Sequence, residues 1–486
     1  MELRHGSLVR ISVRNHLLLD SYHDKIRTAV TTHLGDRTRA LHEALAQALA
    51  QGAYEGVSPA TIASHWLACG RGHDAAFYLV EAARIAEEKL AFERADALRE
   101  QVLELLPDDI ESRPLATLRT RALIGLAHRL RVTDHHHQAL EHLAAAEATA
   151  AAHALVEPLA TIHYLRGSLL FPRGDIEGCV AAHEQACRYA AQAGSARAQA
   201  RALSGLGDAD YMRGRMLSAY RHFSRCIELS VNHGLVEIEA GALPMVGWTR
   251  LFSNELDAAQ RLSRDAMLRA DEVGHRRAAV VCRCGCYPQL LLEMRRLDEA
   301  QQELTRGMQM AHELGARRFE AEALANLGQL MALRGDYDQA VVLIERGLAL
   351  CRQTGFSYIG PWVLAKLAFA TRDPEQRRGA LAEAEACLAD STLSHNHLYF
   401  YRESMDTAFD MDEPSRIERY ADALERYTTD EPLPFADLFV ARGRALAAHA
   451  RDPSRLEPLR AIHRQTEQLG YHTAARLTRH LLGEGT

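Results

Sequence analysis

The chain has 486 residues, 47% of them apolar and only 6% aromatic, with a formal net charge of −7. This composition is typical of closely packed helices, and the charge excludes the basic surface of a nucleic-acid binder. No stretch reaches the roughly 18 apolar residues of a membrane span. The amino terminus lacks a signal-peptide pattern, and nine cysteines without framework spacing indicate a reducing compartment, so the sequence predicts a cytoplasmic protein.

The first hundred residues differ from the rest of the chain. Leu3 to Val13 alternates apolar and polar residues, which predicts a short strand or ribbon. Arg37 to Leu49 has leucines at helical spacing, which predicts an amphipathic helix. Ser58-Pro59 then forms a cap and first turn, so another helix is expected to begin there.

Two segments of this region carry a resemblance. Tyr22–Arg27 reads Tyr-His-Asp-Lys-Ile-Arg, and Leu41–Ala46 reads Leu-His-Glu-Ala-Leu-Ala. The region from Leu3 to Leu106 resembles the junction in bacterial signal-transduction ATPases, where a small winged-helix domain ends and a repeat arm begins. The resemblance is greatest to multidomain Ser/Thr protein kinases and adenylate cyclases that carry an ATPase module. It implies a winged-helix remnant in residues 1–52.

The catalytic parts of those proteins have no counterpart in this sequence. There is no Gly-x-x-x-x-Gly-Lys-Ser/Thr phosphate loop, and neither a His-Arg-Asp nor an Asp-Phe-Gly motif occurs. We therefore expect no nucleotide binding, no cofactor and no enzymatic activity. The chain reads as an effector arm whose ATPase is encoded elsewhere, or as part of a larger regulator.

From residue 120 onward the dominant feature is an internal repeat. One series of turn positions, spaced by 40, 40, 41 and 40, is Gly194, Gly234, Gly274, Gly315 and Gly355. A second series in the same phase is Gly174, Gly214, Asn254, Arg295 and Gly335. Two such series at one period predict stacked helix pairs. Each turn residue is expected in the left-handed conformation that ends a helix.

A further glycine recurs inside the first helix of these pairs, at Gly167, Gly207, Gly247 and Gly328. Glycine within a helix costs about 1 kcal/mol relative to alanine, so it indicates a close helix–helix approach. The segment Glu320–Gly355, with Leu-Gly followed by Gly-Asp-Tyr and Ala340, resembles the tetratricopeptide family. Its period exceeds the roughly 34 residues of that family, and is similar to that of the sensor arms of maltose-type activators.

The fold class expected is therefore all-α: a right-handed α-solenoid of tetratricopeptide-like helix pairs. The expected domains are a winged-helix remnant with a junction helix (1–52), N-terminal helix pairs (53–119), six repeats (120–361), and degenerate repeats with a cap (362–486).

Four reactive-looking clusters have ordinary structural explanations. Cys282, Cys284 and Cys286 lack a second cluster for a zinc tetrahedron, which favours buried apolar packing over a metal or redox role. His135–His137 and His395–His397 are interpreted as turn residues, with a metal site as the alternative. His23 and Asp24 have no accompanying nucleophile, so a structural role is favoured over catalysis. No metal site is predicted.

The tetratricopeptide resemblance does imply a groove, because the first helix of each pair lines the concave face in that family. The implied partner-binding residues are Tyr164, Phe171, Arg201, Asp208, Tyr211, Trp248, Phe252, Gln289, Glu322 and Gln329. Large aromatic side chains exposed there would anchor a partner. The alternative is that a tight superhelix buries them against neighbouring repeats.

The function predicted is that of a non-catalytic protein-interaction scaffold or sensor arm of a bacterial signalling system. Its partner would be a protein or peptide in the concave groove, and a signalling ATPase or kinase is one candidate. Nucleic acid and membrane are not expected partners. The alternative is a separately encoded regulatory subunit of a kinase, adenylate cyclase or transcriptional-regulator ATPase.

Overall fold

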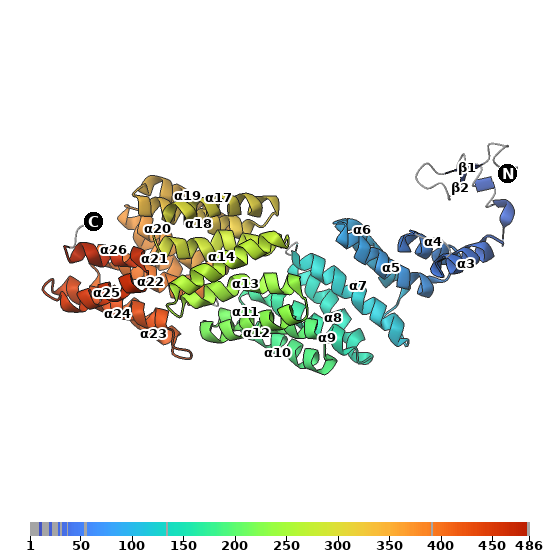
Figure 1. Cartoon of the computed structure of the whole chain (residues 1–486), viewed down its shortest axis with the longest axis horizontal. Helices are drawn as coiled ribbons and strands as arrows, with labels where there is room; N and C mark the ends of the chain where they lie inside the picture. The colour runs from blue at the N-terminus through green and yellow to red at the C-terminus, as the bar shows by residue number, and fades with distance from the viewer. Residues whose placement is uncertain are drawn as a thin grey trace. The chain divides into compact units, whose positions relative to one another are not determined.

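The computed structural model describes residues 9–11, 19–21, 28–29, 32–35, 37–52, 56–132, 135–389 and 392–483. The chain divides into two compact units, Met1–Pro158 and Leu159–Thr486 (Figure 1). Among the described residues, no helix is long and apolar enough to cross a membrane. The domain boundaries expected after residues 52, 119 and 361 stay predictions.

The first unit begins with two short antiparallel strands, β1 (Val9–Ile11) and β2 (Leu19–Ser21), with Val9 opposite Ser21. Its helices are α3 (Arg37–Ala50), α4 (Pro59–Ala68), α5 (Gly72–Glu88), α6 (Phe92–Leu105), α7 (Arg113–Val132) and α8 (His136–Ala152). The Ser58 hydroxyl accepts a hydrogen bond from the Thr61 amide at 3.2 Å, so the expected cap of α4 is confirmed. The segment Tyr22–Arg27 and nearly half of residues 1–52, the expected winged-helix remnant with its junction helix, lie outside the described residues.

The second unit is an all-α array of helix pairs. Its first part is α9 (Val156–Leu170), η1 (Phe171–Arg173), α10 (Ile176–Ala193), α11 (Ala196–Met212), α12 (Met216–Asn232), α13 (Val236–Leu251), α14 (Leu256–Glu272), α15 (Arg276–Val281), η2 (Cys282–Cys286), α16 (Tyr287–Glu293), α17 (Leu297–Glu313), α18 (Arg317–Arg334) and α19 (Tyr337–Thr354). The remainder is α20 (Phe356–Ala370), α21 (Pro374–Leu388), α22 (Ser394–Asp410), α23 (Pro414–Tyr427), α24 (Pro434–Arg451), α25 (Glu457–Gln468) and α26 (His472–Leu481). The predicted all-α solenoid is confirmed.

The turn residues of both series adopt the expected left-handed conformation except Gly355, whose φ is 126° and whose ψ is 98°. The φ angles of the second series are 73° at Gly174, 79° at Gly214, 59° at Asn254, 57° at Arg295 and 92° at Gly335. All five are left-handed, including the two positions where a side chain makes that conformation costly. The turn therefore keeps its left-handed conformation at Asn254 and Arg295, although these residues are not glycine.

The glycines inside the helices lie where neighbouring helices approach most closely. A Cβ atom at Gly207 would lie 2.7 Å from the Phe223 ring on α12. A Cβ atom at Gly328 would clash with the Ile344 side chain and lie 2.9 Å from the Ala340 carbonyl oxygen on α19. The predicted packing role of these glycines is therefore confirmed.

One helix of the array contains an extra residue. Cys282–Cys286 forms a π-helical turn between α15 and α16, and such a turn accommodates a single inserted residue. Both turn series lengthen by one position across this helix, from Asn254 to Arg295 and from Gly274 to Gly315. The irregular spacing in the sequence thus corresponds to the widened turn. Pro288 follows directly, where its missing amide donor suits an interrupted helix.

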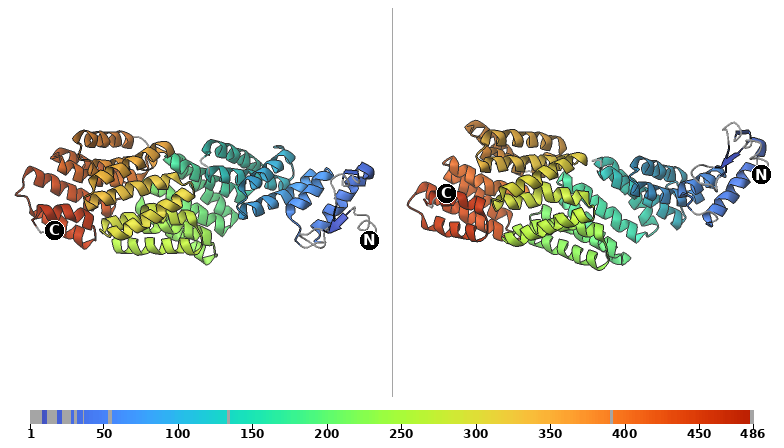
Figure 2. Two further views of the ribbon diagram at one scale, coloured as in Figure 1. Left: turned by 90° about the horizontal axis from the view of Figure 1, so that it is seen from above. Right: turned by 45° about the horizontal axis from the view of Figure 1, so that its top comes forward.

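The helices after Thr371 pack against the repeats of the same unit, as Figures 1 and 2 show in orange and red. The Phe435 amide at the start of α24 donates to the Phe252 carbonyl oxygen at 3.2 Å. The Glu431 carboxylate accepts from the Leu217 amide at the start of α12 at 2.8 Å. One hydrophobic core accordingly includes side chains of α11, α13, α18, α20, α22, α24 and α26.

Candidate functional site

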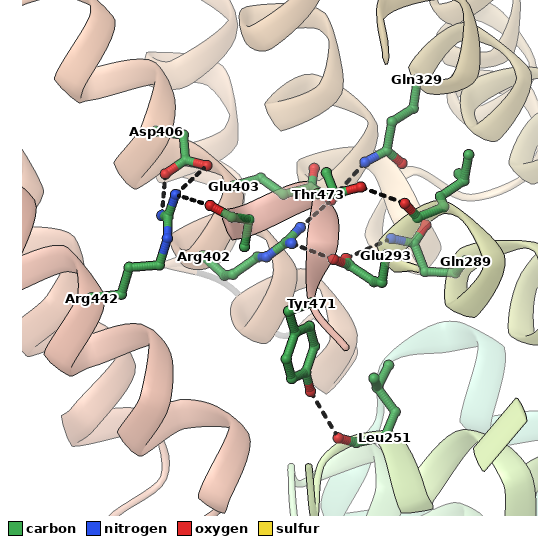
Figure 3. A network of polar contacts seen from close by, with 12 residues as sticks. Leu251, Gln289, Glu293, Gln329, Arg402, Glu403, Asp406, Arg442, Tyr471 and Thr473 are labelled. Carbon is green, nitrogen blue, oxygen red and sulfur yellow. Dashed lines mark hydrogen bonds and ion pairs between the residues drawn. The ribbon is translucent and has the colours of Figure 1, made fainter. Parts of the chain in front are cut away.

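Polar and charged side chains form a buried layer between the repeats and the C-terminal helices. We call this group the inner layer: Gln289 and Glu293 on α16, Gln329 on α18, Lys366 on α20, and Arg402 and Glu403 on α22 (Figure 3 shows most of it). All six side chains are buried. Burying so many polar groups is tolerable only when they bond to one another.

Lys366 joins three helices through its ammonium group. Its Nζ donates to the Gln329 side-chain oxygen, lies 3.4 Å from the Gln289 oxygen, and lies 3.8 Å from a Glu403 carboxylate oxygen. Burial lowers the pKa of Lys366 to about 8, although the carboxylates of Glu403 and Glu293 oppose that shift. The ammonium group is therefore held by amide oxygens and one carboxylate in place of water.

Arg402 supplies the second cation of the inner layer. Its guanidinium group forms an ion pair with Glu293 and lies 3.6 Å from Glu403. It also lies over the Phe439 ring, 4.8 Å from the ring centre. Burial raises the pKa of Glu293, and the Arg402 charge opposes this shift. Because two cations face two carboxylates here, the layer is balanced in charge and holds α16 to α22.

The last helices complete the layer with neutral hydrogen bonds. The Tyr471 hydroxyl donates to the Leu251 carbonyl oxygen at 3.2 Å, and the Thr473 hydroxyl bonds to the Leu292 carbonyl (Figure 3). Both acceptors are carbonyls near the ends of helices of the repeats, and each also accepts from a backbone amide of the following turn, Leu251 from Asn254 at 2.9 Å and Leu292 from Arg295 at 3.2 Å. The C-terminal helices therefore add a second hydrogen bond to carbonyls at the ends of α13 and α16.

Three of the five aromatic residues expected in the groove are buried. Tyr211, Trp248 and Phe252 are 6%, 4% and 0% exposed. The Trp248 ring stacks on Tyr399 of α22, with ring centres 5.8 Å apart, and its indole nitrogen donates to the Tyr211 hydroxyl at 3.1 Å. The expectation that these side chains are exposed anchors is wrong. The chain's own C-terminal helices cover them, an arrangement that the repeat period cannot indicate.

The other expected groove residues fall into two groups. Gln289 and Gln329 are brought together around Lys366 in the inner layer. The remaining five, Tyr164, Phe171, Arg201, Asp208 and Glu322, are partly exposed. Partner binding at these positions stays a prediction. The sequence reasoning missed Lys366, Arg402 and Glu403. The available signal for Lys366 was a single charge in the otherwise apolar stretch Phe356–Ala370.

Glu322 differs from the inner layer because its carboxylate has no hydrogen-bond or ion-pair partner among the described residues, although it is only partly exposed. It faces Gly285 in the π-helical turn, where a Cβ atom would clash with the carboxylate. Burial raises its pKa to about 7, while the nearby cations Lys366 and Arg318 oppose the shift. The Glu322 carboxylate thus occupies room that Gly285 leaves by lacking a side chain, and burial makes its ionisation unfavourable.

Phenol and thiol groups surround this carboxylate. Burial raises the pKa of the Tyr358 phenol, and the nearby Glu322 charge raises it further. The same two causes, in the same order, raise the pKa of the Cys284 and Cys351 thiols. Neither kind of group neutralises a carboxylate. Within the described part of the chain, the surroundings of Glu322 are therefore weakly polar and contain no permanent counter-ion in direct contact.

The structure shows where the reactive-looking clusters of the sequence lie. Cys282, Cys284 and Cys286 are buried, and burial raises the pKa of each thiol. The expectation that His395–His397 lie in a turn is wrong, because these residues belong to the first turns of α22 and pack inside the molecule. Burial lowers the pKa of His395 and of His397 to about 4. The part of the chain that the structure describes contains no group of three or more His, Cys, Asp or Glu side chains arranged to hold a metal. His23 and Asp24 lie outside that part.

No protein-family model matches the sequence, and no curated protein matches it. Solved structures show weak similarity. The Rap conjugation gene regulator of plasmid pLS20, in complex with the Phr* peptide, is 12% identical over 66% of this chain and 93% of its own, with a TM-score of 0.48. NprR in complex with its cognate peptide NprX is 13% identical over 67% and 98%, with a TM-score of 0.46. A Rap protein complexed with Competence and Sporulation Factor is 14% identical over 75% and 97%, with a TM-score of 0.44.

Proposed function

We propose that the chain is a non-catalytic regulatory module that binds a peptide or protein on the inner face of the repeats in Leu159–Thr486. The observation that carries this proposal is that three charged residues, which the tetratricopeptide resemblance assigns to the groove, are partly exposed on α11 and α18: Arg201, Asp208 and Glu322. Helix-pair arrays present continuous surfaces to partners and rarely carry chemistry themselves. A partner recognised at these three residues would be held mainly by polar contacts, because the aromatic side chains of Tyr211, Trp248 and Phe252 are buried.

The arrangement also suggests how binding would be transmitted. Repeats contact mainly their neighbours, so a ligand that touches α11 and α18 together adds a contact between distant repeats. Binding to the folded array alone would raise its stability by mass action. The stiffer array would then be the signal, and the next component of a bacterial signalling system would recognise it.

A charge-reversal pair tests the proposal. The purified full chain is mixed with a random heptapeptide library, and bound peptides are recovered by gel filtration and identified by mass spectrometry. We expect recurring sequences whose binding is lost in Arg201→Glu, at a position assigned to the groove, and kept in Arg346→Glu, exposed on α19. The proposal fails if no peptide is retained, or if the two variants bind alike.

The alternative drawn from the sequence, a regulatory subunit of a kinase, cyclase or regulator ATPase, stays a prediction. It rests on two segments: Tyr22–Arg27, which lies outside the described residues, and Leu41–Ala46, which lies in α3. That a signalling ATPase is the partner likewise stays a prediction. No observation in the described residues favours it over the peptide-binding module.

A further inference from the structure

The strongest unexplained feature of the molecule is the side chain of Arg295, in the turn between α16 and α17. Its Nη1 atom is buried and has no hydrogen-bond partner. The rest of the guanidinium group forms no hydrogen bond or ion pair with a described residue. A buried donor without an acceptor is costly, and such a group in a folded protein often marks the place of a bound ion or water.

The backbone at Arg295 adds a second cost. Its φ of 57° is the left-handed conformation that glycine adopts without strain. Three of the five equivalent turn positions hold glycine. The fourth, Asn254, uses its side chain to accept a hydrogen bond from the Tyr471 hydroxyl at 2.9 Å. Arg295 therefore bears the strain of a side chain at this position without a polar contact inside the described chain.

Two arginines of the last helix lie beside Arg295. α26 packs against α16, and the Thr473 hydroxyl bonds to the Leu292 carbonyl oxygen, which also accepts from the Arg295 amide at 3.2 Å. Thr473, Arg476 and Arg479 are each three residues apart, so they are successive neighbours on the surface of α26. Burial lowers the pKa of Arg295, and the charges of Arg476 and Arg479 lower it further. Three cations therefore share one corner of the fold.

Only one of these arginines is paired with an acidic side chain of the described chain. Arg479 forms an ion pair with Glu467, whose other carboxylate oxygen lies 3.2 Å from Nδ1 of His472. Arg476 is exposed and, like Arg295, has no ion pair with a described residue. Two unpaired guanidinium groups thus remain in this corner, and like charges at close range repel each other.

The chemistry of the corner selects its ligand. Guanidinium groups bind carboxylate and phosphate through paired N–H donors. An anion between two of them would supply the missing acceptors and offset their repulsion. Two unpaired cations favour a dianion, such as phosphate, over a carboxylate that carries a single charge. A metal ion or an ammonium group would be repelled.

We propose that Arg295 and Arg476, with Arg479 beside them, form a binding site for a phosphate group. The site lies where α16 meets α26, so an occupant would hold the last helix more firmly to the repeats. Its residues are separate from the peptide surface proposed on α11 and α18, and the inference does not depend on that surface. The strained backbone and the unpartnered guanidinium of Arg295 then have a common explanation, because a glycine at this position would bind no anion.

Titration of the full chain tests the site. Inorganic phosphate and glycerol phosphate are added at constant ionic strength and slightly alkaline pH, where both are mainly dianions. Sodium acetate and sodium chloride are the comparisons. Low millimolar concentrations avoid the general stabilising effect of phosphate salts. We expect saturable binding of at least one phosphate compound in calorimetry, at least about tenfold tighter than that of acetate, and a rise in melting temperature.

Three variants locate the binding. Arg295→Gly removes the guanidinium group and relieves the backbone, so phosphate affinity should fall at least about tenfold while the melting temperature without ligand does not fall. Arg476→Gln, at an exposed position, should also lower the affinity. Arg444→Met, which removes an exposed arginine paired with Asp422 and Glu425 on α23, is the matched control and should bind like the parent.

The outcomes are distinct from those of the peptide experiment. Loss of phosphate binding in an Arg295→Gly variant that is as stable as the parent supports the site, because a purely structural arginine would not separate the two quantities. If that variant is less stable, the affinity of Arg476→Gln decides. The site is wrong if the parent binds no phosphate, if acetate binds as tightly, or if phosphate binds the parent, Arg295→Gly and Arg476→Gln alike. None of these results affects the proposed peptide surface. Tighter binding of glycerol phosphate than of inorganic phosphate assigns the site to a phosphate ester, and the reverse assigns it to the free ion.

Discussion

The Tyr211 hydroxyl lies 2.6 Å from Nδ1 of His395, 184 positions further along the chain. The other ring nitrogen of His395, Nε2, lies 2.6 Å from the Tyr358 carbonyl oxygen, which can only accept, so Nε2 carries the hydrogen. Nδ1 therefore accepts from Tyr211, and the Tyr211 oxygen accepts in turn from Trp248. This series of hydrogen bonds requires that His395 is neutral, which agrees with burial lowering the pKa of His395 to about 4.

Replacing Trp248 should therefore lower the stability of the fold and not only alter a binding surface. Trp248→Ala opens a cavity beneath α22 and should lower the free energy of unfolding by about 3–5 kcal/mol. Phe77→Ala, at an aromatic residue that is 46% exposed, is the control and should cost far less. Urea unfolding followed by circular dichroism measures both. An unchanged unfolding midpoint for Trp248→Ala would contradict its placement in the core.

The inner layer gives a second prediction. Arg402→Met leaves Glu293 buried without its counter-charge, and should destabilise the second unit by about 3–5 kcal/mol. Arg444→Met removes exposed ion pairs with Asp422 and Glu425, and should cost no more than about 1 kcal/mol. Chemical denaturation of the two variants gives the comparison. Equal effects would mean that the Arg402–Glu293 pair is open to water.

The close approach at Gly328 can be tested with a side chain as small as alanine. Gly328→Ala places a methyl group against Ile344 and the Ala340 carbonyl, and should cost about 1–3 kcal/mol. Gly328→Leu and Gly207→Leu should cost at least as much. Gly379→Ala in α21, where a Cβ atom meets nothing within 4 Å, should instead stabilise by up to about 1 kcal/mol. Thermal unfolding of the four variants distinguishes these signs.

Glu322 predicts a specific dependence of stability on pH. Its pKa is about 7 in the folded chain and 4.5 ordinarily, so the folded state holds an extra proton between these values. Stability should then fall as pH rises from about 4.5 to about 7. Glu322→Gln removes this loss. At pH 7.5 it should be more stable than the parent by about 1–2 kcal/mol, allowing for partial exposure, and at pH 4.5 the two should match. A difference that does not change with pH would contradict the raised pKa.

The left-handed turn at Arg295 gives a fifth prediction. With φ at 57°, Arg295 has a conformation that glycine adopts without cost, so Arg295→Gly should stabilise by about 1 kcal/mol. Asn254→Gly should not, because the Asn254 side chain accepts a hydrogen bond from Tyr471 at 2.9 Å. Melting temperatures at one pH compare them directly. A destabilised Arg295→Gly variant would show that the arginine side chain outweighs the backbone strain.

Features that repeat locally could be predicted from the sequence, and features that join distant segments could not. The turn positions and the packing of Gly207 and Gly328 depend on contacts within one helix pair, so the repeat period in the sequence predicts them. The burial of Trp248 depends on Tyr399, from a region where that period has faded. Lys366 was detectable as an isolated charge in an apolar helix, but its partners Gln289 and Glu403 come from helices on either side of it in the chain.

The widened turn at Cys282–Cys286 limits how this array can be rearranged. An α-helix advances about 100° per residue, so removing the extra residue would rotate Gln289 and Glu293 away from Lys366 and Arg402. Repeats before the turn and repeats after it are therefore not interchangeable modules, even though each obeys the same period. Duplication or transplantation of a repeat should be tolerated within either stretch and should fail across the turn, because the offset in this helix aligns the array with its C-terminal helices.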